Sequence, residues 1–116
     1  MSDFTQLKCE ACQAGAPPAT DDERADFLND HPDWEVAEVD GVPHLRRTFK
    51  FSNFVAALDF TNRIGALAEA ENHHPALLTE WGKSTVTWWT HKIKDLHLND
   101  LIAASKTDAI YEASSE

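Results

Sequence analysis

The densest group of residues able to move protons lies between positions 69 and 75 of the 116-residue chain. Glu69 precedes His73 by four residues, and His73 is followed by His74 and Pro75. Residues four apart in a helix share a face, so we expect the Glu69 carboxylate to accept a hydrogen bond from His73 and fix its tautomer. Pro75 favours an extended backbone at His74, so the two rings should flank a small pocket from different directions. Because imidazole exchanges protons near neutral pH, this segment predicts a general acid–base site.

A third histidine, His91, follows a predicted strand over residues 84–90. If that strand packs beside the helix that ends at His73, His91 reaches the same pocket. The alternative is a histidine at a strand end that hydrogen-bonds in solvent, and it applies equally to His31, His44 and His97. A zinc site of His73, His74 and His91 is disfavoured, because adjacent ligands held by a proline strain tetrahedral geometry and no helical H-E-x-x-H pair is present.

The elements that must position these histidines follow from periodicity and turn chemistry. A capping box at Thr20 and Glu23 starts a short helix, and Asp40-Gly41 and Gly82-Lys83 are the turns of two predicted hairpins. Apolar residues at helical spacing follow Ser52, the expected N-cap of the longest helix. The expected elements are helices over residues 21–29, 53–72 and 98–112 and strands over residues 34–39, 42–51, 77–81 and 84–90. This α-β-β-α-β-β-α order predicts an α+β fold, a four-stranded antiparallel sheet with helices packed on one face.

Composition bounds the function further. The chain has 10 Lys and Arg against 20 Asp and Glu, a net charge of −10, which argues against binding to nucleic acid or to anionic membranes. It has no apolar run of about 20 residues and no signal-peptide pattern at its start, so we expect a cytoplasmic protein. We expect residues 1–19 to be a flexible arm and linker with reduced thiols at Cys9 and Cys12, residues 20–112 a single catalytic domain and residues 113–116 a frayed tail.

One combination of motifs spans most of the chain. An acid stands four residues before His-His-Pro, an aromatic residue follows, a histidine ends the next strand and an aspartate opens the last helix; the residues are Glu69, His73, His74, Pro75, Trp81, His91 and Asp100. In this combination the chain resembles the pterin-4a-carbinolamine dehydratases, and its C-x-x-C arm and Trp88-Trp89 resemble the bacterial branch associated with phenylalanine hydroxylase. Leu77 stands where the animal branch has a tryptophan.

The resemblance implies dehydration of 4a-hydroxytetrahydropterin to quinonoid dihydropterin and water. By the same resemblance His73 and His91 are the acid and the base, in either order, and His74 holds the pterin. Glu69 orients His73, while Asp100 either bonds the pterin ring or caps its own helix. Trp81 either stacks on the pterin or fills the core, and neither a cofactor nor a metal ion is expected.

The resemblance also implies partners. Family members form dimers or tetramers, and the edge of the second hairpin and the Trp88-Trp89 pair are consistent with self-association. A phenylalanine hydroxylase is the expected protein partner. The alternative function is a non-catalytic adaptor or transcriptional co-regulator, which has no physical reason to keep this histidine set.

Overall fold

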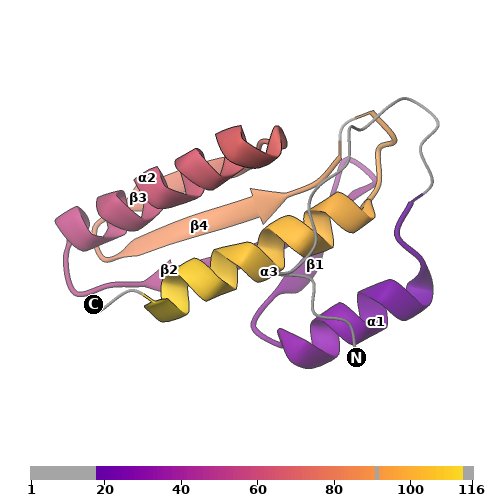
Figure 1. The fold of residues 1–116 in the computed structure, drawn as a ribbon, viewed down its shortest axis with the longest axis horizontal. Helices are drawn as coiled ribbons and strands as arrows, with labels where there is room; N and C mark the ends of the chain where they lie inside the picture. The colour runs from indigo at the N-terminus through magenta and orange to yellow at the C-terminus, as the bar shows by residue number, and fades with distance from the viewer. Residues whose placement is uncertain (1–17, 91, 114–116) are drawn as a thin grey trace.

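The structure is a computed structural model that describes residues 18–90 and 92–113. Its elements follow the predicted order: α1 (Asp21–Asp30), β1 (Glu35–Val39), β2 (Val42–Lys50), α2 (Phe54–Glu71), β3 (Ala76–Glu80), β4 (Lys83–Trp88) and α3 (Leu98–Ala113). Figure 1 shows α2 and α3 lying across one face of the sheet, with α1 beside α3. The predicted α+β fold is confirmed.

The four strands form one antiparallel sheet in the order β1-β2-β4-β3. The first hairpin turns at Asp40-Gly41 as predicted, with positive φ at both residues (54° and 79°). The predicted turn of the second hairpin was wrong by one residue, because Glu80 pairs with Lys83 and leaves Trp81-Gly82 in the turn. Gly82 supplies the positive φ (77°) that this turn requires.

Side chains cap the first two helices at their N-termini. The predicted capping box of α1 is present: Glu23 N–H donates to the Thr20 hydroxyl and Thr20 N–H donates to the Glu23 carboxylate. For α2 the predicted cap was one residue early. Asn53 is the N-cap, and its Oδ1 accepts from the Ala56 N–H at 2.8 Å, because an amide oxygen at this position reaches the third amide of the helix.

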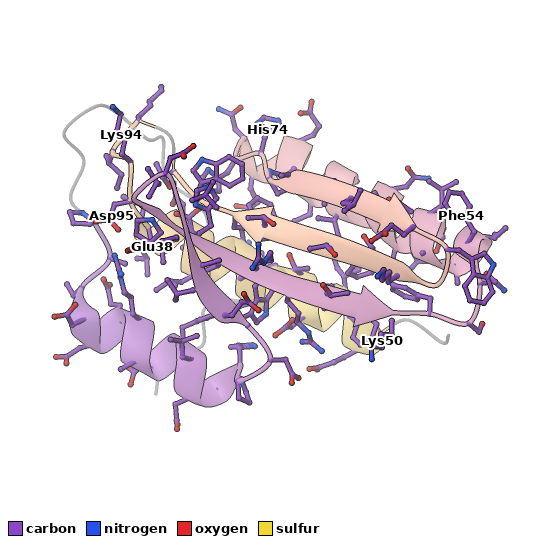
Figure 2. The ribbon with its side chains drawn as sticks, turned by 180° about the vertical axis from the view of Figure 1, so that it is seen from behind. Glu38, Lys50, Phe54, His74, Lys94 and Asp95 are labelled. Carbon is purple, nitrogen blue, oxygen red and sulfur yellow. The ribbon has the colours of Figure 1, made fainter. Side chains whose placement is uncertain are left out.

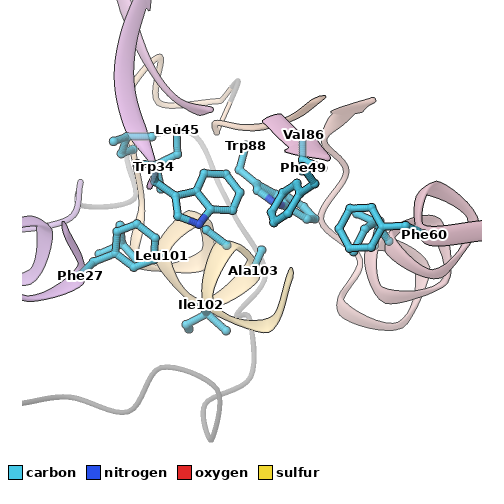
Figure 3. Close-up of a cluster of buried hydrophobic side chains, with 14 of the residues drawn as sticks. Phe27, Trp34, Leu45, Phe49, Phe60, Val86, Trp88, Leu101, Ile102 and Ala103 are labelled. Carbon is cyan, nitrogen blue, oxygen red and sulfur yellow. The ribbon is translucent and has the colours of Figure 1, made fainter. Parts of the chain in front are cut away.

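The core lies between the sheet and the helices (Figure 3) and is rich in aromatic rings, among them Phe27, Trp34, Phe49, Phe60 and Trp88. Arg47 interrupts the apolar face of β2. Its guanidinium donates to Asp108 of α3 at 2.7 Å and lies 4.4 Å from the centre of the Phe49 ring. A carboxylate and an aromatic face therefore compensate this partly buried charge.

The ends of two helices and one strand meet at one end of the molecule. In Figure 1 the C-terminal end of α2, the C-terminal end of β4 and the N-terminal end of α3 lie together. Side chains from elements far apart in the sequence can therefore converge there. Among the helices of residues 18–90 and 92–113, none is long and apolar enough to cross a membrane.

Candidate functional site

The end of α2 determines where the adjacent histidines begin. Asn72 adopts the left-handed conformation (φ 51°, ψ 42°), and the His73 N–H donates to the Ala68 carbonyl at 3.1 Å. This is the hydrogen-bond pattern of a Schellman motif, in which asparagine is one of the few non-glycine residues tolerated at the left-handed position. The chain leaves the helix at Asn72, so His73 no longer lies on a helical face.

His73 forms a buried pair with Asp100. The Nε2 atom of His73 lies 2.6 Å from Oδ1 of Asp100, and the two side chains are 9% and 0% exposed. An ionised carboxylate only accepts hydrogen bonds, so Nε2 carries the ring proton and donates a hydrogen bond to Asp100. Within the described part of the chain Nδ1 has no hydrogen-bond partner, and this atom is not fully buried. Nδ1 is therefore the nitrogen open to a small molecule.

The other oxygen of Asp100 has its own partners. Oδ2 accepts from the Thr90 hydroxyl at 2.7 Å and from the His97 N–H at 2.9 Å. The sequence left open whether Asp100 would cap its helix or act on a ring, and in the structure this carboxylate caps α3 through His97 and also holds the imidazole of His73. The buried charge is thus compensated by three donors.

The face of the His73 ring packs on Trp88, with ring centres 5.5 Å apart and planes inclined by 12°. Trp88 is itself fixed, since it is fully buried and its indole N–H donates to Thr107 at 3.1 Å. The sequence did not indicate that Trp88 or Thr90 belongs to this site. The alternation of the strand carried the signal, because residues two apart in a strand share a face.

The predicted pairing of Glu69 with His73 was wrong. Glu69 Oε2 lies 2.5 Å from Nε2 of His74, and both side chains are largely exposed (79% and 57%). The i, i+4 rule assumes continuous helix, but α2 ends at Glu71 and the left-handed Asn72 turns the chain. The carboxylate that holds His73 comes instead from α3.

Two further residues, Trp81 and His91, were predicted to belong to the site. Trp81 is 72% exposed in the β3–β4 turn, so the interpretation as a core residue was wrong. A strand rises about 3.3 Å per residue, so Trp81 and Thr90, beyond opposite ends of β4, are about 20 Å or more apart. Figure 2 shows His74 beyond the C-terminal end of α2 and Phe54, the first residue of α2, at the far end of the molecule. His91, like Cys9 and Cys12, lies outside the described residues.

The geometry suits proton transfer. A carboxylate that holds one nitrogen of an imidazole fixes its tautomer and stabilises the imidazolium that forms when the other nitrogen accepts a proton. His74 and Glu69 lie beside this dyad at the surface, where they are able to contact a bound molecule. No three His, Cys, Asp or Glu side chains within residues 18–90 and 92–113 are grouped so as to hold a metal ion.

Known proteins are similar to this sequence over most of its length. The profile of the family described as pterin 4 alpha carbinolamine dehydratase matches residues 17–110. A relative from Syntrophotalea carbinolica, provisionally named a pterin-4-alpha-carbinolamine dehydratase, is 57% identical over 112 residues, which cover 97% of this chain and 100% of the relative. A relative from Nitrosococcus oceani with the same provisional name is 56% identical over 110 residues, which cover 95% of this chain and 97% of the relative.

Solved structures share the fold. A crystal structure described as a transcriptional coactivator/pterin dehydratase from Brucella melitensis has a TM-score of 0.72 and 29% identity, covering 82% of this chain and 99% of that one. A pterin dehydratase-like protein described as a RuBisCO assembly factor in the alpha-carboxysome has a TM-score of 0.59 and 21% identity, covering 70% of this chain and 92% of that one. The second likeness concerns the fold alone. By the match of its sequence, the chain belongs to the pterin 4 alpha carbinolamine dehydratase family.

Proposed function

We propose that this protein is a hydro-lyase that converts 4a-hydroxytetrahydropterin into quinonoid dihydropterin and water. The family assignment supports the reaction, and the buried His73–Asp100 dyad is the single observation that supports histidine acid–base catalysis. The reaction moves protons and changes no oxidation state. The bond between C4a and its hydroxyl breaks, N5 loses its proton, and a double bond forms between N5 and C4a.

Two proton-transfer groups serve this reaction. One protonates the departing hydroxyl so that it leaves as water, and the other accepts the proton of N5. We assign these roles to His73, through its open Nδ1, and to His91, in either order. Covalent geometry supports the inclusion of His91, which is the next residue after Thr90, and Thr90 contacts the same carboxylate as His73.

The exposed pair of His74 and Glu69 is assigned to substrate holding. Their side chains lie at the surface beside the dyad, where imidazole and carboxylate are able to hydrogen-bond a polar heterocycle. We exclude Trp81 from the site of its own chain, because it lies beyond the other end of β4.

The test is turnover of a 4a-hydroxytetrahydropterin generated in situ. We expect His73→Ala to lower kcat by about 10² to 10⁴ fold, the usual contribution of general acid–base catalysis, with an unchanged far-UV circular dichroism spectrum. The matched control is His31→Asn, which removes a histidine that pairs with Asp108 but keeps an amide donor in its place. Full turnover in folded His73→Ala would falsify the assignment. Stoichiometric zinc in the purified protein, with activity lost to a chelator, would indicate a metal-dependent mechanism instead.

The second candidate function is a binding role without catalysis. The description of the Brucella melitensis protein, 29% identical, as a transcriptional coactivator as well as a pterin dehydratase favours it. A protein with this role alone would show no dehydration above the uncatalysed rate, and His73→Ala would change nothing. We further propose that the chain self-associates, acts in the cytoplasm and serves an aromatic amino-acid hydroxylase, most directly a phenylalanine hydroxylase that releases the 4a-hydroxy product.

A further inference from the structure

The two oxygens of the Asp100 carboxylate serve different purposes. Oδ1 accepts the Nε2–H of His73, whereas Oδ2 accepts from Thr90 and from the backbone of His97. The donors on Oδ2 determine how the carboxylate is rotated. That rotation decides whether Oδ1 lies in the plane of the imidazole, where its hydrogen bond with Nε2–H is strongest.

The two donors on Oδ2 have different origins. The His97 N–H is the N-cap amide of α3, and Asp100 stands three residues later, so this bond belongs to the start of the helix itself. The Thr90 hydroxyl comes from the chain just after β4. The hydrogen bond from this hydroxyl therefore ties the carboxylate to the sheet. The bond is buried, because Thr90 is only 2% exposed.

The same stretch of chain also contacts the histidine ring directly. Trp88, two residues before Thr90, packs against the face of His73, and the backbone of Thr90 is held by its N–H, which donates to the Asp95 carbonyl at 3.2 Å. Trp88 thus restrains the ring perpendicular to its plane, while Asp100, locked by Thr90, restrains it within the plane. Together they fix the orientation of the ring and therefore the position of Nδ1.

We propose that Thr90 is a positioning residue of the dehydration reaction. Its hydroxyl locks the Asp100 carboxylate so that Oδ1 keeps the proton on Nε2 of His73 and leaves Nδ1 for proton transfer. Thr90 acts through Asp100 and need not touch the substrate. This inference rests on the proposed function of His73, and it predicts that loss of the hydroxyl affects turnover more than binding.

The experiment compares four variants. Thr90→Val removes the hydroxyl and keeps the shape, Thr90→Ala removes the hydroxyl and a methyl group, and Thr90→Ser keeps the hydroxyl. Thr87→Val is the matched control, the same substitution three residues earlier on β4 and on the other side of the strand. The measurements are kcat, KM and the proton resonance of the His73 Nε2–H in the hydrogen bond with Asp100, identified by its absence in His73→Ala.

We expect Thr90→Val and Thr90→Ala to lower kcat about tenfold, as for loss of one charge-assisted hydrogen bond, with KM changed less than about twofold. The Nε2–H resonance should shift upfield or broaden by exchange in both variants. Thr90→Ser should restore both readouts, and Thr87→Val should leave them unchanged. Measuring two hydroxyl-free variants makes the result independent of the folding of either one.

The outcomes separate the two proposals. Normal kcat and an unshifted Nε2–H resonance in either folded hydroxyl-free variant, alongside an inactive His73→Ala, would overturn the role of Thr90 alone. The same would follow if Thr90→Ser were as impaired as Thr90→Val, because packing rather than the hydroxyl would then matter. Full turnover in His73→Ala would instead overturn the proposed function.

Discussion

The adjacent residues His73 and His74 have opposite surroundings. His73 is almost buried and pairs with a fully buried carboxylate, whereas His74 and its partner Glu69 are mostly exposed. An ion pair in water contributes little, because solvent competes for both groups, whereas a buried carboxylate holds its partner in one geometry. The two histidines therefore depend on their acids to different degrees.

This difference predicts unequal effects for two similar substitutions. Asp100→Asn replaces an acceptor by a group that can present an N–H to Nε2, so the tautomer of His73 is no longer fixed, and we expect kcat to fall by about a hundredfold or more. Glu69→Gln should change kcat by less than about threefold, since its pair is solvent-exposed. Steady-state turnover of both variants checks this. Equal losses would mean that the buried carboxylate has no special part in the reaction.

At the residue scale, sequence reasoning identified the participants of the dyad but not their pairing. Residue types and spacing were enough to select His73, and the family resemblance added Asp100. The pairing depended on one backbone conformation, the left-handed Asn72, which ends the helical register between Glu69 and His73. The 27-residue separation between His73 and Asp100 is a tertiary contact that no local periodicity reports.

Among the elements, a buried polar contact joins α3 to the residue that follows α1. Asp108 of α3 accepts from His31 at 2.5 Å, from the Trp34 indole at 2.9 Å and from Arg47 at 2.7 Å. Its carboxylate thus joins the residue after α1, the residue before β1 and the middle of β2 to one helix. The acid that Arg47 contacts depends on how the helices pack, so local sequence patterns could not predict it.

Loss of this contact should lower stability. We expect Asp108→Asn to reduce the free energy of unfolding by about 3 kcal/mol, because Arg47 would keep its partly buried charge without its closest partner. Asp59→Asn removes the partner of Arg63 in an exposed pair on α2 and should cost less than about 0.5 kcal/mol. Urea denaturation of both variants measures the difference. If the two losses were equal, the network around Asp108 would not anchor α1.

At the scale of the whole molecule, the order of the elements was predictable and the surface was not. Periodicity, the capping box at Thr20 and the turn residues together were enough to predict all seven elements. Of the two alternatives for Trp81, burial in the core was wrong, because this residue lies in a turn and is exposed. Phe54, Val55 and Leu58 near the start of α2 are exposed as well. The Phe51 N–H donates to the Gly82 carbonyl at 2.9 Å, which holds this turn beside the chain that leads into α2. Hydrophobicity alone cannot distinguish a side chain buried in its own core from one available to another copy.

The edge strands give a test of self-association. Leu78 of β3 and Val36 of β1 are both exposed and apolar, on opposite edges of the sheet. We expect the protein to sediment as a dimer or larger at micromolar concentration, and Leu78→Lys to shift it toward monomer, because a charged edge opposes strand pairing between copies. Val36→Lys is the matched control on the other edge and should leave the assembly intact. A wild-type monomer at that concentration would contradict self-association.

The carboxylates of Asp100 and Asp108 stand on the same helix, eight residues or about 12 Å apart along its axis. Asp100 pairs with His73, and Asp108 pairs with the residues that follow α1. Because both carboxylates stand on one rigid helix, a single orientation of α3 about its axis must place both of them correctly. Deleting or inserting one residue between them would turn one carboxylate by about 100° relative to the other. Apolar residues between the two aspartates can therefore be exchanged during evolution, whereas the number of residues between Asp100 and Asp108 is hard to change.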